Sequence, residues 1–172
     1  MKKARFSRRE FLFGFRQRFS VQLPQTTSCL HSDAKKADEY LAQENYKDAK
    51  KIYLKMIEQR ADNLVARQKL AYCYYKLGDI KNALKEFLEL RKRGVKSNFT
   101  SLYLGLCFAH IGDVENAIKS LKNFFDITKP IVQRAINLQI ALYESNMAKK
   151  DDLINSIEQA IEEQSKIENS ML

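Results

Sequence analysis

Three cysteines and two histidines are the residues of this chain best suited to act as nucleophiles, proton carriers or metal ligands. None of the cysteines, Cys29, Cys73 and Cys107, belongs to a CxxC pair, and neither His31 nor His110 has a cysteine or a carboxylate pair at metal-ligand spacing. A glycine-rich phosphate loop, a nucleophile elbow and an HExxH motif are also absent from the sequence. We therefore predict a protein that is not an enzyme and has no cofactor and no metal, with Cys73 and Cys107 serving as small buried hydrophobic side chains.

The composition indicates a helical protein whose basic charge is concentrated at one end. The chain has 172 residues, of which 45% are hydrophobic, and only two prolines and five glycines. Seven lysines and arginines against Glu10 place +6 of the net charge of +9 in residues 1–20. A nucleic-acid surface across the whole fold is therefore not expected. The sequence has no apolar run of about eighteen residues, so we expect no membrane-spanning helix.

An offset of 34 residues aligns the chain with itself. Residues 70–87, LAYCYYKLGDIKNALKEF, match residues 104–121, LGLCFAHIGDVENAIKSL, without gaps. In the first copy Tyr74 and Leu77 lie on one helical face, Gly78 ends that helix, and a second helix follows. A hairpin of this kind leaves an apolar face that only a neighbouring hairpin can cover. The sequence therefore predicts a stack of helical hairpins.

This pattern resembles the tetratricopeptide repeat family, which has leucine, a small residue, tyrosine, glycine, alanine and phenylalanine at fixed offsets. The matching positions are Leu70, Ala71, Tyr74, Gly78, Ala83 and Phe87 in one copy and Leu104, Gly105, Phe108, Gly112, Ala117 and Leu121 in the next. An earlier copy keeps Ala37, Tyr40, Ala49 and Tyr53, but Lys36 and Glu44 stand at its leucine and glycine positions. A later copy keeps Leu138 and Leu142 and lacks the alanine and the aromatic residue of the second helix.

The resemblance implies an all-α fold, a right-handed superhelical stack of about three and a half to four hairpins. We expect an N-terminal arm at 1–29, a repeat domain at 30–165 and a tail at 166–172. Within the domain we expect repeats near 30–63, 64–97 and 98–131, followed by a degenerate hairpin at 132–165 that caps the stack.

Proteins of this family mostly bind a protein or peptide in a concave groove lined by the first helix of each hairpin, so the resemblance implies a scaffold or adaptor. By register, the groove residues are Lys35, Gln68, Lys69, Tyr72, Tyr75, Lys76, Phe99, Leu102, Tyr103, Leu106, His110 and Tyr143. Aromatic rings interspersed with lysines favour an apolar partner segment with some acidic character. The alternative is that several rings pack between neighbouring repeats. The carboxylate clamp of some relatives is not expected, because only Lys69 matches it.

The stretch SRREFLF, residues 7–13, resembles the core of a bacterial twin-arginine export signal. Arg16 and Arg18 interrupt the uncharged segment that should follow it, so export is the less favoured interpretation. The residues assigned to targeting or docking are Arg8, Arg9, Phe11, Leu12, Phe13, Phe15, Arg16 and Arg18.

Three alternatives remain for this arm. Docking on a partner would suit an assembly chaperone or maturation factor of an exported redox enzyme. Binding to an anionic bilayer would suit a peripheral scaffold, and the phenylalanines could instead fold back on the exposed end of the stack. We expect a bacterial, cytoplasmic protein, with the inner-membrane surface as an alternative place and self-association through repeat ends as a further interaction. No RNA-binding signature accompanies the arm, so nucleic acid is not an expected partner.

Overall fold

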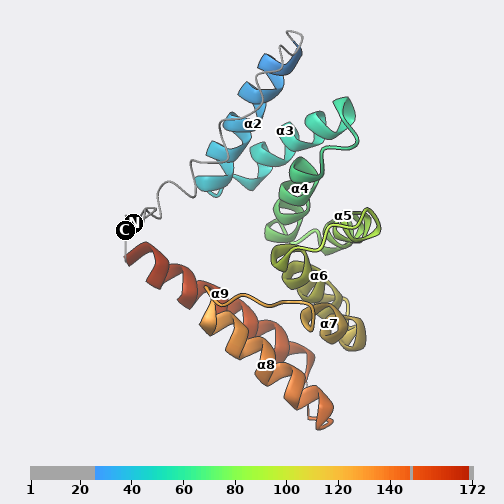
Figure 1. Ribbon diagram of the computed structural model, residues 1–172, viewed down its shortest axis with the longest axis vertical. Helices are drawn as coiled ribbons and strands as arrows, with labels where there is room; N and C mark the ends of the chain where they lie inside the picture. Colours follow the sequence, from blue (N-terminus) through green and yellow to red (C-terminus); the bar gives the residue numbers. More distant parts are fainter. Residues whose placement is uncertain (1–25, 148, 171–172) are drawn as a thin grey trace, which may run out of the picture.

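The computed structural model describes residues 26–147 and 149–170, and every regular element in that part of the chain is an α-helix (Figure 1). The elements are α2 (Thr26–Ala42), α3 (Tyr46–Gln59), α4 (Leu64–Lys76), α5 (Ile80–Lys92), α6 (Asn98–His110), α7 (Val114–Leu121), α8 (Pro130–Glu144) and α9 (Lys150–Ser170). Consecutive helices pack as the hairpins α2–α3, α4–α5, α6–α7 and α8–α9. The prediction of an all-α stack of hairpins is confirmed.

The turn inside each hairpin has the same backbone geometry, repeated every 34 residues. A residue with positive φ occupies this turn in all four hairpins: Glu44 (57°), Gly78 (76°), Gly112 (89°) and Asn146 (57°). The N–H of the following residue donates to the carbonyl five positions back, for example from Asp79 to Tyr74 at 2.9 Å. This is the bond that closes a helix C-terminus in the Schellman motif. The first and fourth hairpins therefore keep the turn conformation of the repeat, although Glu44 and Asn146 stand in place of its glycine.

Side-chain caps fix where the helices begin. The side chains of Asn45, Asp79 and Asp113 accept hydrogen bonds from the backbone N–H three residues on, which starts α3, α5 and α7. Asn63 and Ser97 do the same for α4 and α6. Each cap satisfies an N–H that has no partner within the helix, and this stabilises the helix start by about 1 kcal/mol.

The core consists of two clusters that meet in α4. The smaller one joins the first hairpin to α4 through Tyr53, Met56 and Leu70. The larger one runs from α4 to α9 and includes Phe87 and Leu106. Each hairpin thus buries its apolar face against the next, as a repeat stack requires.

Two helices extend past the limits of the domains expected from the sequence. Helix α2 begins at Thr26, within the segment 1–29 that was expected to form the arm. Helix α9 continues to Ser170, beyond the predicted end at 165. No glycine or proline interrupts either stretch, so the helix continues past the limit obtained by counting in units of 34.

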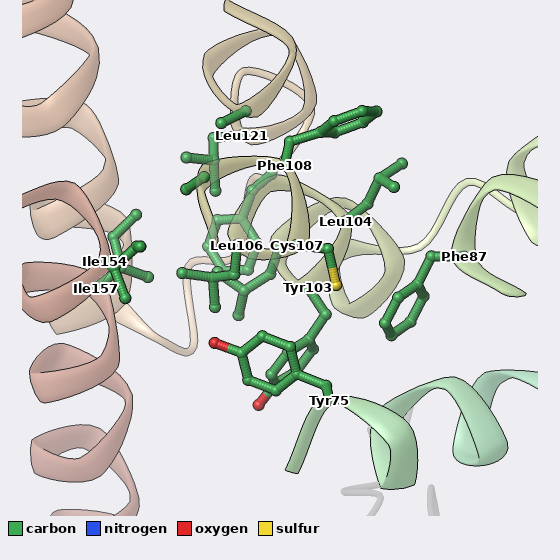
Figure 2. Close-up of a cluster of buried hydrophobic side chains, with 14 of the residues drawn as sticks. Tyr75, Phe87, Tyr103, Leu104, Leu106, Cys107, Phe108, Leu121, Ile154 and Ile157 are labelled. Carbon is green, nitrogen blue, oxygen red and sulfur yellow. The ribbon is translucent and has the colours of Figure 1, made fainter. Parts of the chain in front are cut away.

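The fourth hairpin packs differently from the others. Helix α7 has only eight residues, and the segment 122–129 separates it from α8, which begins at Pro130. Helices α8 and α9 form a long pair at one end of the molecule, and α9 also contacts α6 (Figure 1). In Figure 2, Ile154 and Ile157 extend from α9 toward Leu106 of α6. The last hairpin therefore covers part of the face that the first helices of the stack present.

Candidate functional site

An outward-facing row of side chains on α4 forms the centre of the candidate site. Lys69, Tyr72 and Lys76 are spaced three and four residues apart, so they lie on one side of the helix. The Tyr72 ring meets Tyr46 at a centroid distance of 6.0 Å and Phe99 at 5.4 Å, both edge-on. We call these five residues the tyrosine face. It joins α3, α4 and α6 across three successive hairpins.

The rings of the tyrosine face are held in place and remain partly accessible. Tyr46 and Tyr72 are half-buried, and Phe99 is 37% exposed. Edge-to-face contacts of this kind stabilise a cluster beyond simple area burial. Burial also raises the pKa of Tyr72 above its ordinary value, so its hydroxyl stays protonated. The face therefore presents neutral aromatic surface.

The three lysines of the predicted groove have different surroundings. Lys69 forms an ion pair with Asp38 of α2, with Nζ 2.6 Å from Oδ1. Lys35 lies 3.9 Å from Glu39 at an exposed position. The ammonium of Lys76 lies 5.8 Å from the centroid of the Tyr46 ring, in cation–π geometry. Lys76 is thus the lysine of the tyrosine face best placed to meet a partner's carboxylate.

Four of the predicted groove residues are buried under α9 or between repeats. They are Tyr75, Leu102, Tyr103 and Leu106, and Leu106 has no exposed surface. Helix α9 approaches them with Ile154 and Ile157. Here the groove that the register predicts is core, because α9 fills it. The alternative that some rings pack inside the stack holds for Tyr75 and Tyr103.

A polar contact fastens α9 to this part of the stack. The Tyr75 hydroxyl donates a hydrogen bond to Glu158 of α9. His110 lies beside both, with its Nε2 3.4 Å from the Tyr75 oxygen and 3.8 Å from the Glu158 carboxylate. These three residues come from α4, α6 and α9. Their contacts attach the last hairpin to the second and third.

The remaining predicted groove residues lie apart from the tyrosine face. The Gln68 amide donates to Ser97 Oγ at 3.0 Å and to Thr100 Oγ1 at 3.3 Å, so it links two repeats. Tyr143 of α8 packs half-buried against the larger core cluster. Tyr46 was not among the predicted groove residues, because that prediction counted only positions in the first helix of each hairpin. It is the first residue of α3 and corresponds to Ile80 and Val114 in later repeats. An apolar residue at that position is the signal that could have found it.

Cys73 and Cys107 are both buried. Burial raises the pKa of Cys73 to about 11 and that of Cys107 to about 12, so neither thiol is ionised near neutral pH. Within the same residues, no three His, Cys, Asp or Glu side chains gather as a metal site would need. None of the described helices is both long and apolar enough to cross a membrane. The predicted targeting residues between Arg8 and Arg18 lie outside the described part.

The fold and this site define a class: a stack of helical hairpins whose surface is suited to binding other proteins. Residues 40–106 match the family model of the tetratricopeptide repeat, which supports that family. A comparison with curated proteins gives no match.

Two solved structures are similar over most of their length. One is the crystal structure of MamA, at a TM-score of 0.59 and 14% identity, with 81% of each chain covered. The other is the type III secretion translocator chaperone SycD of Yersinia enterocolitica, at a TM-score of 0.54 and 15% identity, with 81% of this chain and 97% of that chain covered. At these identities the likeness shows the fold.

Proposed function

We propose that this protein is a non-enzymatic scaffold that binds a segment of a partner protein on the tyrosine face. The observation that carries the proposal is the cluster of Tyr46, Tyr72 and Phe99, in which the Tyr72 ring contacts the other two and all three stay partly open to solvent. Ordered aromatic side chains provide contact area at low cost in conformational entropy, which is why they dominate binding surfaces. The family match over residues 40–106 covers α4 and most of α6, and it supports the same role.

The chemistry of the face favours a partner segment that is apolar and carries a carboxylate. The rings accept apolar side chains, and the exposed ammonium of Lys76 stands at their edge. The partner's carboxylate would then lie next to Lys76 while its apolar side chains cover Tyr72. The chaperone name of SycD agrees with a protein-binding role. The maturation-factor and membrane alternatives stay predictions made from residues 1–20.

Selection of a random peptide phage library on the immobilised full-length protein tests this proposal. We expect enriched peptides that combine aromatic or aliphatic residues with Asp or Glu. The variant Lys76→Glu should weaken their binding at least tenfold, about 1.4 kcal/mol, because the reversed charge repels the carboxylate. The matched control is Lys81→Glu, which reverses another exposed lysine, on α5. If both variants bind the selected peptides as tightly as the wild type, the tyrosine face is not the binding site.

A further inference from the structure

A second surface lies where α9 passes α6; it shares Phe99 with the tyrosine face, but its charged residues are mainly acidic. A cleft with a volume of about 180 Å³ opens there, between α6, the start of α8 and the C-terminal half of α9. Its apolar wall includes Phe99, Tyr103 and Ile161. A cavity of about 150 Å³ is known to accommodate one benzene ring. The cleft can therefore take the ring of one phenylalanine.

The edge of this cleft is mainly acidic. Asp126 and Glu168 line it together with one cation, Lys129. Hydrogen bonds from Thr128 hold the pKa of Asp126 below its usual range, so this carboxylate stays ionised. The next hollow along α9 is lined by Glu158 and Glu162 together with one lysine, Lys76 of α4. Helix α9 as a whole carries six acidic residues against two lysines.

Beside the cleft, the segment between α7 and α8 presents further apolar surface. Phe125 is 70% exposed and Ile127 is 81% exposed. The side chain of Asn98 holds this segment against α6 by two hydrogen bonds with the Phe125 backbone. An occupant of the cleft would therefore meet an aromatic pocket, a neighbouring apolar ledge and a row of carboxylates.

We infer that the cleft is the docking site of the chain's own N-terminal arm, residues 1–25. This segment carries phenylalanines at 6, 11, 13, 15 and 19 among arginines at 5, 8, 9, 16 and 18. A phenylalanine ring fits the pocket, and the arginines next to it in sequence meet the carboxylates of α9 and Asp126. Arginine and carboxylate form paired, charge-assisted hydrogen bonds. The arm and the cleft are thus complementary in both apolar character and charge.

The arm is long enough to reach the cleft. The described chain begins at Thr26, and α2 is about 26 Å long. Tyr46 follows the end of α2 in the sequence. The centroid of its ring lies 6.0 Å from that of Tyr72, and the Tyr72 centroid lies 5.0 Å from that of Tyr103, which lines the cleft. Phe11 and Phe13 precede Thr26 by 15 and 13 residues, which span about 45–55 Å when extended. The arm can therefore dock within the same molecule.

Limited trypsin digestion of the full-length protein, followed by intact mass, tests this docking. The enzyme cuts after the arginines of the arm, and a docked arm resists it. The double variant Glu162→Gln/Glu168→Gln removes two cleft-side charges without changing the arm, and we expect cleavage within residues 1–25 to become at least threefold faster. The matched control is Asp152→Asn/Glu163→Gln, two exposed acids of α9 that do not line the cleft. It should be cut at the wild-type rate.

Three results would overturn the inference. Equal cleavage of the wild type and both variants would mean that the arm does not dock on α9. Protection that increases with protein concentration would place the arm on a second molecule. Protection seen only with phosphatidylserine vesicles would assign the arm to a membrane surface. The assay uses the purified chain alone, so it is independent of the peptide selection that tests the tyrosine face.

Discussion

Cys73 and Cys107 occupy equivalent positions in successive repeats, and neither has exposed surface. Each lies in the packed interior, Cys73 in the smaller core cluster and Cys107 in the larger one. Burial disfavours the thiolate and raises both pKa values, and at Cys73 it outweighs the opposing effect of the Lys50 charge. The role predicted from the sequence, that of small hydrophobic side chains, agrees with this environment.

The burial of Cys73 and Cys107 predicts that their thiols react slowly with an alkylating reagent. At pH 7.5, iodoacetamide should label Cys73 and Cys107 at least about a hundredfold more slowly in the folded protein than in urea, because the reactive thiolate is both buried and scarce. The rates follow from tryptic mass spectrometry of the labelled chain. Labelling of both cysteines at the unfolded rate would contradict this.

The same shift predicts a loss of stability at high pH. A raised pKa means that the folded state retains a proton that the unfolded state releases, so the stabilising contribution is present below about pH 8.5. It is lost as the pH rises toward about 11 for Cys73 and about 12 for Cys107. Urea unfolding should show a steeper decline above pH 8.5 for the wild type than for Cys73→Ala/Cys107→Ala.

At the level of helices and turns, each hairpin turn contains one residue with positive φ, and different residue types occupy that position. Gly78 and Gly112 adopt positive φ without strain, whereas Glu44 carries a side chain in the same conformation. The left-handed conformation costs a residue with a side chain about 1–2 kcal/mol. The first hairpin therefore contains strain that the second and third avoid.

Exchanging the turn residues tests this difference. Glu44→Gly should raise the free energy of unfolding by about 0.5–1 kcal/mol, since the relief of strain exceeds the added flexibility of glycine. Gly78→Ala should lower it by about 1–2 kcal/mol. A Cβ at Gly78 would have no heavy atom within 4 Å outside its immediate neighbours, so only the backbone conformation is tested. Urea denaturation measures both changes, and a stabilising Gly78→Ala would contradict the argument.

The 34-residue offset was sufficient to predict these hairpins, because caps and turns are local features. It could not predict where the last hairpin packs. Ile154, Ile157 and Ile161 have the spacing of an amphipathic helix, and that spacing is compatible with any apolar surface. For the candidate site, register counting placed Tyr72, Lys76 and Leu106 together in the groove, and it could not predict that Leu106 is buried. Burial there depends on a contact between residues about fifty positions apart.

At the scale of the whole molecule, the contact between α9 and α6 joins distant parts of the chain. Repeat stacks usually have only neighbour-to-neighbour contacts, so their stability is a sum of local terms. Here Tyr75 and Glu158 are 83 positions apart and share a hydrogen bond. The second, third and fourth hairpins should therefore unfold together.

Removing one apolar side chain from α9 tests this coupling. Ile157 is fully buried, and Ile157→Ala should lower the free energy of unfolding by about 2–4 kcal/mol. The same substitution at Ile167, which is 41% exposed, should cost less than about 1 kcal/mol. Urea unfolding followed by circular dichroism compares the two variants, and equal losses would mean that the docking of α9 contributes little.

The late position of α9 in the sequence also has a consequence for synthesis. Leu106 leaves the ribosome about fifty residues before Ile154 and Ile157, which pack with it in the larger core cluster. At about 5–20 residues per second, this interval lasts roughly 3–10 seconds. The first hairpin can pack against α4 during that time, while the apolar face of α6 stays uncovered. The last described hairpin thus determines when this face is withdrawn from water.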